Sequence, residues 1–132
     1  MRARTLYVLF IGVLACAGCK SQKSTDELIA DLKSSQEMDR IIAVRLLPQR
    51  TADADRVIPA LIETLKQSDG DVRWSAAIGL GTFGDRAKAA IPALQAALHD
   101  KDARVREAAG KAISRIDPSQ SPKTTAGKGA GK

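Results

Sequence analysis

The sequence of 132 residues is long enough for one small domain, and its aromatic content of 3 % requires a core built from Leu, Ile, Val and Ala. The formal net charge of +6 arises at the two ends, because 14 Lys/Arg and 14 Asp/Glu cancel between Ser24 and Ile116. A neutral domain between basic ends argues against a surface that follows phosphates, so we expect no nucleic-acid partner.

Residues 1–19 have the three-part layout of a secretory signal. Arg2 and Arg4 precede an apolar run that begins at Leu6 and ends in small residues and cysteines. The run of 13 residues to Gly18 is short against the roughly 20 needed to cross a bilayer as a helix. The alternatives are an ordinary secretory signal with incidental cysteines and an uncleaved apolar helix.

The end of this segment resembles the lipobox of bacterial lipoproteins, which places a branched apolar residue three positions before a lipidated cysteine and a small residue directly before it. Val13 and Ala15 fit both positions for Cys16. For Cys19 the preceding pair is smaller, but a cysteine stands where an aliphatic residue belongs. We therefore expect lipidation, palmitate included, at Cys16, with Cys19 as the alternative.

The lipobox resemblance implies an address and a membrane partner. Residues 1–15 would be the signal peptide, and residues 16–25 the lipidated N-terminus and a polar tether. The domain would face the periplasm or the exterior, anchored by lipid to the cell membrane or the outer membrane. Neither cysteine is followed by aspartate, which favours the outer membrane in a two-membrane envelope.

From Leu28 onward the chain repeats with a period of 33 residues, in a domain of residues 26–117. The units are 28–60, 61–93 and 94–117. The recurring columns are Leu28, Leu61 and Leu94; Leu32, Leu65 and Leu98; Arg40, Arg73 and Arg106; Ala43, Ala76 and Ala109; and Leu47, Leu80 and Ile113.

Each unit predicts two helices. In the first, apolar residues from Ile58 to Leu65 follow the three-and-four spacing of one helical face. Pro59 and Pro92 suit the first turn of such a helix, where no N–H is needed. The second helix follows a polar break and ends near Phe83 in the middle unit, where glycines accumulate.

Aspartates in the polar breaks are candidate caps for the second helices. The middle unit offers Asp69 or Asp71, and the last unit offers Asp100 or Asp102. The same residues lack the ligand density and glycine placement of a calcium loop, so we expect no metal there.

These columns resemble HEAT repeats, specifically the short HEAT-like type also found in phycobilisome lyases. The pattern stands here as Asp69 or Asp71, Val72, Arg73, Ala76, Ala77, Leu80 and Gly81, and more loosely in the last unit. The first unit departs from it and is interpreted as a terminal unit. The resemblance implies an all-α fold, a short α-solenoid of about three antiparallel helix pairs. It also implies that Arg40, Arg73 and Arg106 are structural, linking neighbouring units, with ligand contact as the alternative.

Trp74 is the candidate for partner binding. With Ile78 it forms a second apolar strip beside the main apolar face of its helix, on the helices that line the concave side of a solenoid. The alternative is that Trp74 packs against an adjacent unit.

No residue set looks catalytic, and we expect neither an enzyme nor a cofactor. His99 is the only histidine, and Ser75 and Ser114 have no neighbouring base in the pattern. The predicted function is a non-catalytic, lipid-anchored scaffold that binds a protein of the bacterial cell envelope. The alternatives are a lyase-like or lyase-accessory protein, as the resemblance implies, and a helical-repeat nucleic-acid binder.

Two features concern the ends of the domain. Residues 118–132 contain prolines, glycines, alanines and lysines without large apolar residues, which predicts a disordered tail. A short array with a degenerate first unit leaves terminal faces to be covered, so self-association is a further expectation.

Overall fold

The computed structural model describes residues 22–121, and every regular element in that range is helical. The α-helices are α1 (Thr25–Asp31), α2 (Glu37–Leu46), α3 (Ala54–Thr64), α4 (Gly70–Thr82), α5 (Ile91–Ala97) and α6 (Ala103–Ile116). Short 3₁₀ helices accompany them: η1 (Leu47–Gln49), η2 (Thr51–Asp53), η3 (Gly84–Ala90) and η4 (Pro118–Gln120). The predicted all-α solenoid of three antiparallel helix pairs is confirmed.

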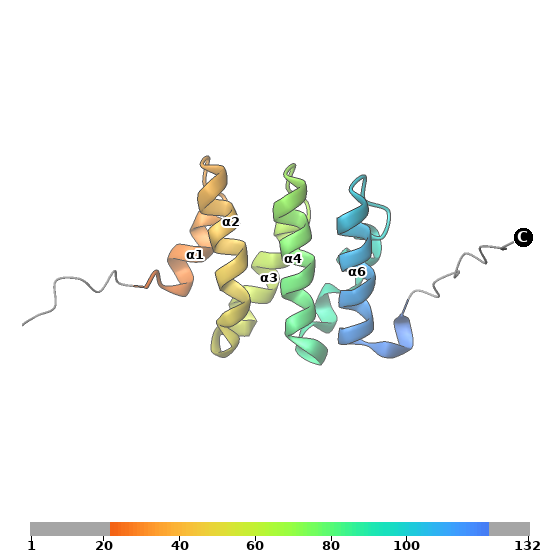
Figure 1. The fold of residues 1–132 in the computed structure, drawn as a ribbon. Helices are drawn as coiled ribbons and strands as arrows, with labels where there is room; N and C mark the ends of the chain where they lie inside the picture. Colours follow the sequence, from red (N-terminus) through yellow and green to blue (C-terminus); the bar gives the residue numbers. More distant parts are fainter. Residues whose placement is uncertain (1–21, 122–132) are drawn as a thin grey trace, which may run out of the picture.

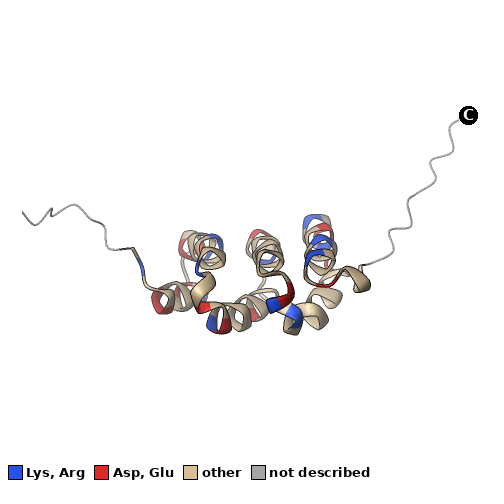
Figure 2. Cartoon of the chain, turned by 90° about the horizontal axis from the view of Figure 1, so that it is seen from below, with Lys and Arg blue, Asp and Glu red and all other residues tan. Residues whose placement is uncertain are grey.

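The helices form two layers. The second helices of the units, α2, α4 and α6, lie side by side in one layer (Figure 1). The first helices form the other layer behind them, and the view along the helices separates the two rows (Figure 2). Helix α4 packs against α2, α3 and α6, so the middle unit is covered on both sides.

The repeated apolar columns form the core between the layers. Leu28, Leu61 and Leu94 are fully buried in the first helices. Their packing partners in the second helices include the fully buried alanines Ala76 and Ala109, whose small side chains allow close helix approach. Each buried leucine contributes about 2 kcal/mol through the hydrophobic effect, which makes these columns the main stabilising feature of the array.

Small residues set the spacing between the second helices. A Cβ atom placed on Gly79 of α4 would lie 2.6 Å from the Cγ atom of Pro48 in the first unit. On the other side of α4, a Cβ on Gly81 would lie 3.2 Å from the Cα atom of Ala112 in α6. Close packing between units therefore requires a glycine at Gly79 and leaves little room for a side chain at Gly81.

The position of Pro59 differs from the prediction. Helix α3 begins at Ala54, so Pro59 lies inside the helix, and the expectation of a first-turn proline is wrong for this residue. Pro59 and Asp55 are both exposed, and water can therefore reach the carbonyl that the missing N–H leaves free. At the equivalent position 33 residues later, η3 occupies the stretch before the proline, α5 begins only at Ile91, and Pro92 does lie in its first turn.

The two ends of the described region are capped. The Ser24 hydroxyl accepts from the Glu27 N–H at 3.3 Å, and the Glu27 carboxylate accepts from the Ser24 N–H at 2.6 Å, which completes a capping box before α1. This hydrogen bonding lowers the pKa of Glu27. At the other end, Asp117 caps η4, which forms the start of the expected tail.

The predicted signal peptide, both cysteines and the rest of the tail lie outside the described residues. Among residues 22–121, none of the helices combines the length and apolar character needed to span a bilayer.

Candidate protein-binding surface

The Arg73 guanidinium lies between the second and third units, and only 4 % of the residue is exposed. Its Nε and Nη2 atoms donate to the two carboxylate oxygens of Asp100, each at 2.8 Å. Its Nη1 atom donates to the carbonyls of Gln67 at 2.9 Å and Ser68 at 2.8 Å. Hydrogen bonding between the two side chains raises the pKa of Arg73 and lowers the pKa of Asp100. Arg73 therefore joins the loop of its own unit to the next unit.

Arg40 and Arg106 repeat parts of this arrangement. Each donates to two backbone carbonyls of the loop before its own helix, at 2.8 and 3.2 Å. Arg40 also reaches the next unit, where its Nη2 atom lies 3.8 Å from a carboxylate oxygen of Asp69. Arg106 has no following unit within the described residues and is exposed. The arginine column thus holds loops in place, and only Arg73 is buried by its neighbour.

Two aspartates of the polar breaks cap helices, and two form contacts between units. Asp69 caps α4 by accepting from the Asp71 N–H at 2.9 Å, and Asp102 caps α6 by accepting from the Arg104 N–H at 2.9 Å. The Arg104 side chain also donates to Asp102, which lowers the pKa of that carboxyl, and it forms an ion pair with Asp71 at 2.8 Å. Asp71 and Asp100 therefore form contacts between units, and the caps are the other two residues.

Trp74 and Ile78 lie on the outer side of the second-helix layer, in the middle of the array. Trp74 is half-buried and packs against the hydrophobic core, while Ile78, one turn later, is 38 % exposed. Together they form a ridge on α4, and a groove lies on each side of it. Trp74 therefore packs against the core and also borders two surface hollows, and its contact with a partner stays a prediction.

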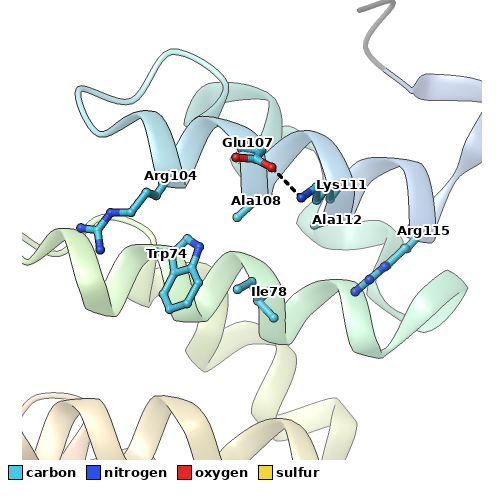
Figure 3. Close-up of a pocket in the computed structure, with 8 residues that line it drawn as sticks. All are labelled: Trp74, Ile78, Arg104, Glu107, Ala108, Lys111, Ala112 and Arg115. Carbon is cyan, nitrogen blue, oxygen red and sulfur yellow. Dashed lines mark hydrogen bonds and ion pairs between the residues drawn. The ribbon is translucent and has the colours of Figure 1, made fainter.

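The groove between α4 and α6, here the α4/α6 groove, has a volume of about 420 Å³. Its apolar lining consists of Trp74 and Ile78 on the α4 side and of Ala108 and Ala112 on the α6 side. Charged side chains of α6 surround this apolar lining. Figure 3 shows Arg104 and Arg115 at opposite ends, with Glu107 and Lys111 along the α6 side.

The charges around the α4/α6 groove are only partly neutralised. The Lys111 ammonium donates to the Glu107 carboxylate at 2.5 Å, and Arg104 is paired with aspartates. Arg115 makes no ion pair within residues 22–121. The groove therefore combines an apolar floor with one cation that is available to a ligand.

The groove between α2 and α4, here the α2/α4 groove, has a volume of about 330 Å³ and is mostly apolar. Val44, Pro48 and the ridge line it, and Arg45 is its charged residue. Arg45 is exposed and, like Arg115, makes no ion pair among the described residues. The ridge is thus bordered by two hollows with apolar walls, each of which carries an arginine that forms no ion pair among residues 22–121.

The sequence prediction named the ridge and missed the basic residues beside it. Arg45, Ile78 and Lys111 occupy the same column of the repeat, 33 residues apart, so the column that supplies Ile78 was the available signal. Arg115 follows Lys111 by one turn on the same helix. The net charge of the domain does not reveal this local group of basic residues, because the domain as a whole is neutral.

The other candidates are not brought together into a site. His99 is exposed after α5, Ser75 is buried on α4, and the Ser114 hydroxyl donates to the carbonyl of Gly110 at 3.0 Å. Within residues 22–121 no three His, Cys, Asp or Glu side chains are grouped as metal ligands would be. Charges of both signs are distributed over both layers (Figure 2).

A family model described as HEAT repeats matches residues 25–114, in agreement with the repeat architecture, the arginine column and the capped second helices. The chain belongs to the HEAT repeat family. The match covers all three units, including the degenerate first one, so the terminal unit is also a HEAT repeat.

Solved structures show the same architecture. The HEAT repeat chain is similar to the complex of CpcE and CpcF of phycocyanin lyase from Nostoc sp., with 29 % identity, a TM-score of 0.66, and coverage of 76 % of this chain and 40 % of that one. Human deoxyhypusine hydroxylase in complex with glycerol shares 26 % identity at a TM-score of 0.61, over 71 % of this chain and 32 % of that one.

An engineered protein shares the fold at 22 % identity and a TM-score of 0.60, over 71 % of this chain and 45 % of that one. The chain spans less than half the length of each of these structures. A comparison with curated proteins gave no match.

Proposed function

We propose that this HEAT repeat protein is a lipid-anchored, non-catalytic scaffold that binds a segment of another protein in the bacterial cell envelope. The observation that carries the proposal is the Trp74/Ile78 ridge between two grooves on the second-helix layer. Repeat arrays commonly use such extended surfaces to hold partners, and a half-buried tryptophan is a typical anchor because it brings a large area with little loss of side-chain entropy.

The chemistry of the two grooves defines the segment. Apolar side chains of the partner would occupy the hollows beside Trp74, and carboxylates would pair with Arg45 and Arg115, the groove-lining cations that form no ion pair in the described region. A partner segment that mixes apolar and acidic residues satisfies both requirements. A basic segment would meet these arginines with like charge.

Trp74 makes this proposal directly measurable, because it is the only tryptophan of the sequence. Titration of the full chain with a synthetic peptide of alternating Leu and Glu is expected to change its fluorescence, and the same peptide with Lys in place of Glu is expected to leave it unchanged. Arg115→Glu should weaken binding of the acidic peptide. Lys88→Glu is the matched control, since Lys88 is exposed on η3 in the other layer.

A second experiment addresses the natural partner. Ile78→Glu changes an exposed residue of the ridge and should reduce the amount of partner protein recovered with the chain from crosslinked membranes. Lys88→Glu should leave this recovery unchanged. Recovery of the same proteins with all variants would contradict a role for the ridge.

The lipid anchor is a separate part of the proposal and rests on the lipobox sequence. Labelling of cells with a palmitate analogue should mark the wild type, and Cys16→Ser should abolish the label if Cys16 is the modified residue. Loss of the label with Cys19→Ser alone would assign the alternative cysteine. Labelling that survives replacement of both cysteines would exclude lipidation at this site.

A second candidate function is a lyase-like or lyase-accessory role. It is supported by the 29 % identity to the phycocyanin lyase complex, over 76 % of this chain. Incubation of the chain with phycocyanin would test it, since a complex detected by gel filtration would favour this candidate. Binding of the acidic peptide without any interaction with phycocyanin would favour the scaffold.

A further inference from the structure

The outer edge of α2 carries an apolar stripe, defined here as Met38, Ile42 and Leu46. These residues are spaced by four and therefore lie on one side of the helix. Their exposed fractions are 66 %, 43 % and 37 %, and with Ile78 they are the large apolar side chains exposed among the described residues. The stripe is separate from the ridge, since Ile78 lies on α4.

The repeat shows which way the stripe faces. The column of Ile42 contains Ser75 and Ala108, which border the grooves toward the preceding unit. The column of Leu46 contains Gly79 and Ala112, which touch Pro48 and Gly81 of the preceding unit. In the first unit the same columns therefore face the end of the array, where no helix covers them within residues 22–121.

The size of these side chains excludes a simple continuation of the array. A Cβ on Gly79 would already lie 2.6 Å from Pro48, so the spacing between units admits only very small residues in this column. Leu46 occupies it in the first unit. Another HEAT unit in the array's own register, including the last unit of a second copy, would therefore collide with α2.

We infer that the stripe binds the stripe of a second copy, with the two α2 helices packed antiparallel across a two-fold axis near Ile42. In this arrangement Ile42 meets Ile42 of the second copy, and Met38 meets Leu46 of the second copy. Residues at intervals of four form ridges that pack against one another in helix pairs. A two-fold interface uses the same patch twice and closes after two copies.

Charges beside the stripe select the antiparallel orientation. Glu37 and Arg45 precede Met38 and Leu46 by one residue, so they lie on the same flank of α2, one at each end. Both are exposed and make no ion pair among the described residues. A two-fold axis across the helices keeps this flank on the same side in both copies.

Antiparallel pairing therefore places Glu37 beside Arg45 of the second copy, twice. Parallel pairing has its two-fold axis along the helices and would place the two flanks on opposite sides, so neither Glu37 nor Arg45 would meet an opposite charge. The dipoles of the two α2 helices also favour the antiparallel orientation. The dimer engages Arg45 of the α2/α4 groove, and it leaves the α4/α6 groove with Arg115 free for a partner segment, because that groove involves neither α1 nor α2.

The test uses charge exchange in the full chain and sedimentation equilibrium at several protein concentrations. The wild type is expected to form a dimer with a dissociation constant in the micromolar range, since a single helix pair buries little surface. Glu37→Arg and Arg45→Glu should each weaken the dimer about tenfold or more, because each replaces two attractive pairs by two repulsive ones. The double variant should recover the wild-type constant.

Mixing gives a second, independent readout. An equimolar mixture of Glu37→Arg and Arg45→Glu should form a heterodimer although each variant alone is mostly monomeric. Ile42→Asp changes an exposed residue and should abolish dimerisation with an unchanged circular dichroism spectrum.

Three results would overturn the inference. These are a wild type that is monomeric throughout the concentration range, failure of the double variant and the mixture to restore the dimer, and association that survives Ile42→Asp. Growth into larger oligomers would show head-to-tail contact and would equally exclude the closed dimer.

Discussion

Replacement of Arg73 by methionine tests how strongly the second and third units depend on their connecting ion pair. Methionine keeps an unbranched apolar stem, is shorter than arginine, and removes all of its hydrogen bonds. The wild-type guanidinium makes two bonds to the Asp100 carboxylate and two to backbone carbonyls, in a place where only 4 % of the arginine is exposed. Loss of the partner also leaves a carboxylate with 12 % side-chain exposure in a poorly hydrated site.

From these contacts we expect Arg73→Met to lower the free energy of unfolding by about 3–4 kcal/mol, since a broken buried pair costs roughly that much. Arg106→Met is the matched control, because Arg106 occupies the same column and makes only the two bonds to carbonyls. It should cost about 1 kcal/mol.

Urea unfolding of the full chain, followed by circular dichroism, measures both values. The difference between the two variants, about 2–3 kcal/mol, isolates the contact between units. Equal effects of the two substitutions would show that the Arg73–Asp100 pair stabilises the array no more than the local loop contacts do, and the reasoning would be refuted.

Three further predictions concern stability. The pKa of Asp100 is lowered in the folded protein. The stability that the Asp100 carboxylate gives to the fold is therefore complete above about pH 4, the range of an unfolded aspartate, and is lost as the pH falls through the folded pKa. The difference in unfolding free energy between the wild type and Asp100→Asn should accordingly narrow in acid titrations. Gly79→Ala should destabilise by about 1–3 kcal/mol through its contact with Pro48, whereas Gly84→Ala, with open space around it and φ of 54°, should cost only about 1 kcal/mol of backbone strain, as thermal unfolding can compare. Ser24→Ala should cost about 1 kcal/mol by removing the cap of α1, and restoration of stability by Ser24→Asp would support that cause; no loss would contradict it.

Most of the architecture could be predicted because one pattern occurs three times. The columns of leucine, alanine and arginine have structural reasons that are visible in the sequence, since burial, close approach and loop bonding each require one residue type. Pro59 was misplaced because residues before it can extend a helix backwards, and only tertiary packing decides whether they do. Ala54 does so before Pro59, whereas the equivalent Ala87 before Pro92 remains in a 3₁₀ helix.

The candidate surface was predictable in part. Trp74 and Ile78 could be placed on one strip from their spacing, but whether a side chain is buried or exposed depends on the neighbouring helix. The choice between Asp69 and Asp71 as cap was likewise open, because both could reach the helix start, and the ion pair of Asp71 with Arg104 depends on a residue of the next unit.

The stripe on α2 was detectable only by comparing units. Met38, Ile42 and Leu46 look like ordinary core residues of a helix, and their exposure follows from the absence of a preceding unit among the described residues. A large residue in a column that is otherwise glycine, alanine or serine is the useful signal.

The contacts that join α4 to α6 also have a mechanical consequence. The Arg73–Asp100 pair fastens these helices near their N-terminal ends, and the contact of Gly81 with Ala112 fastens them near their C-terminal ends. Because α4 and α6 are held together near both ends, the groove between them resists widening and narrowing. The α4/α6 groove therefore has its width before any ligand arrives, so little conformational entropy is lost on binding, and selection among ligands falls to their shape rather than to adaptation of the protein.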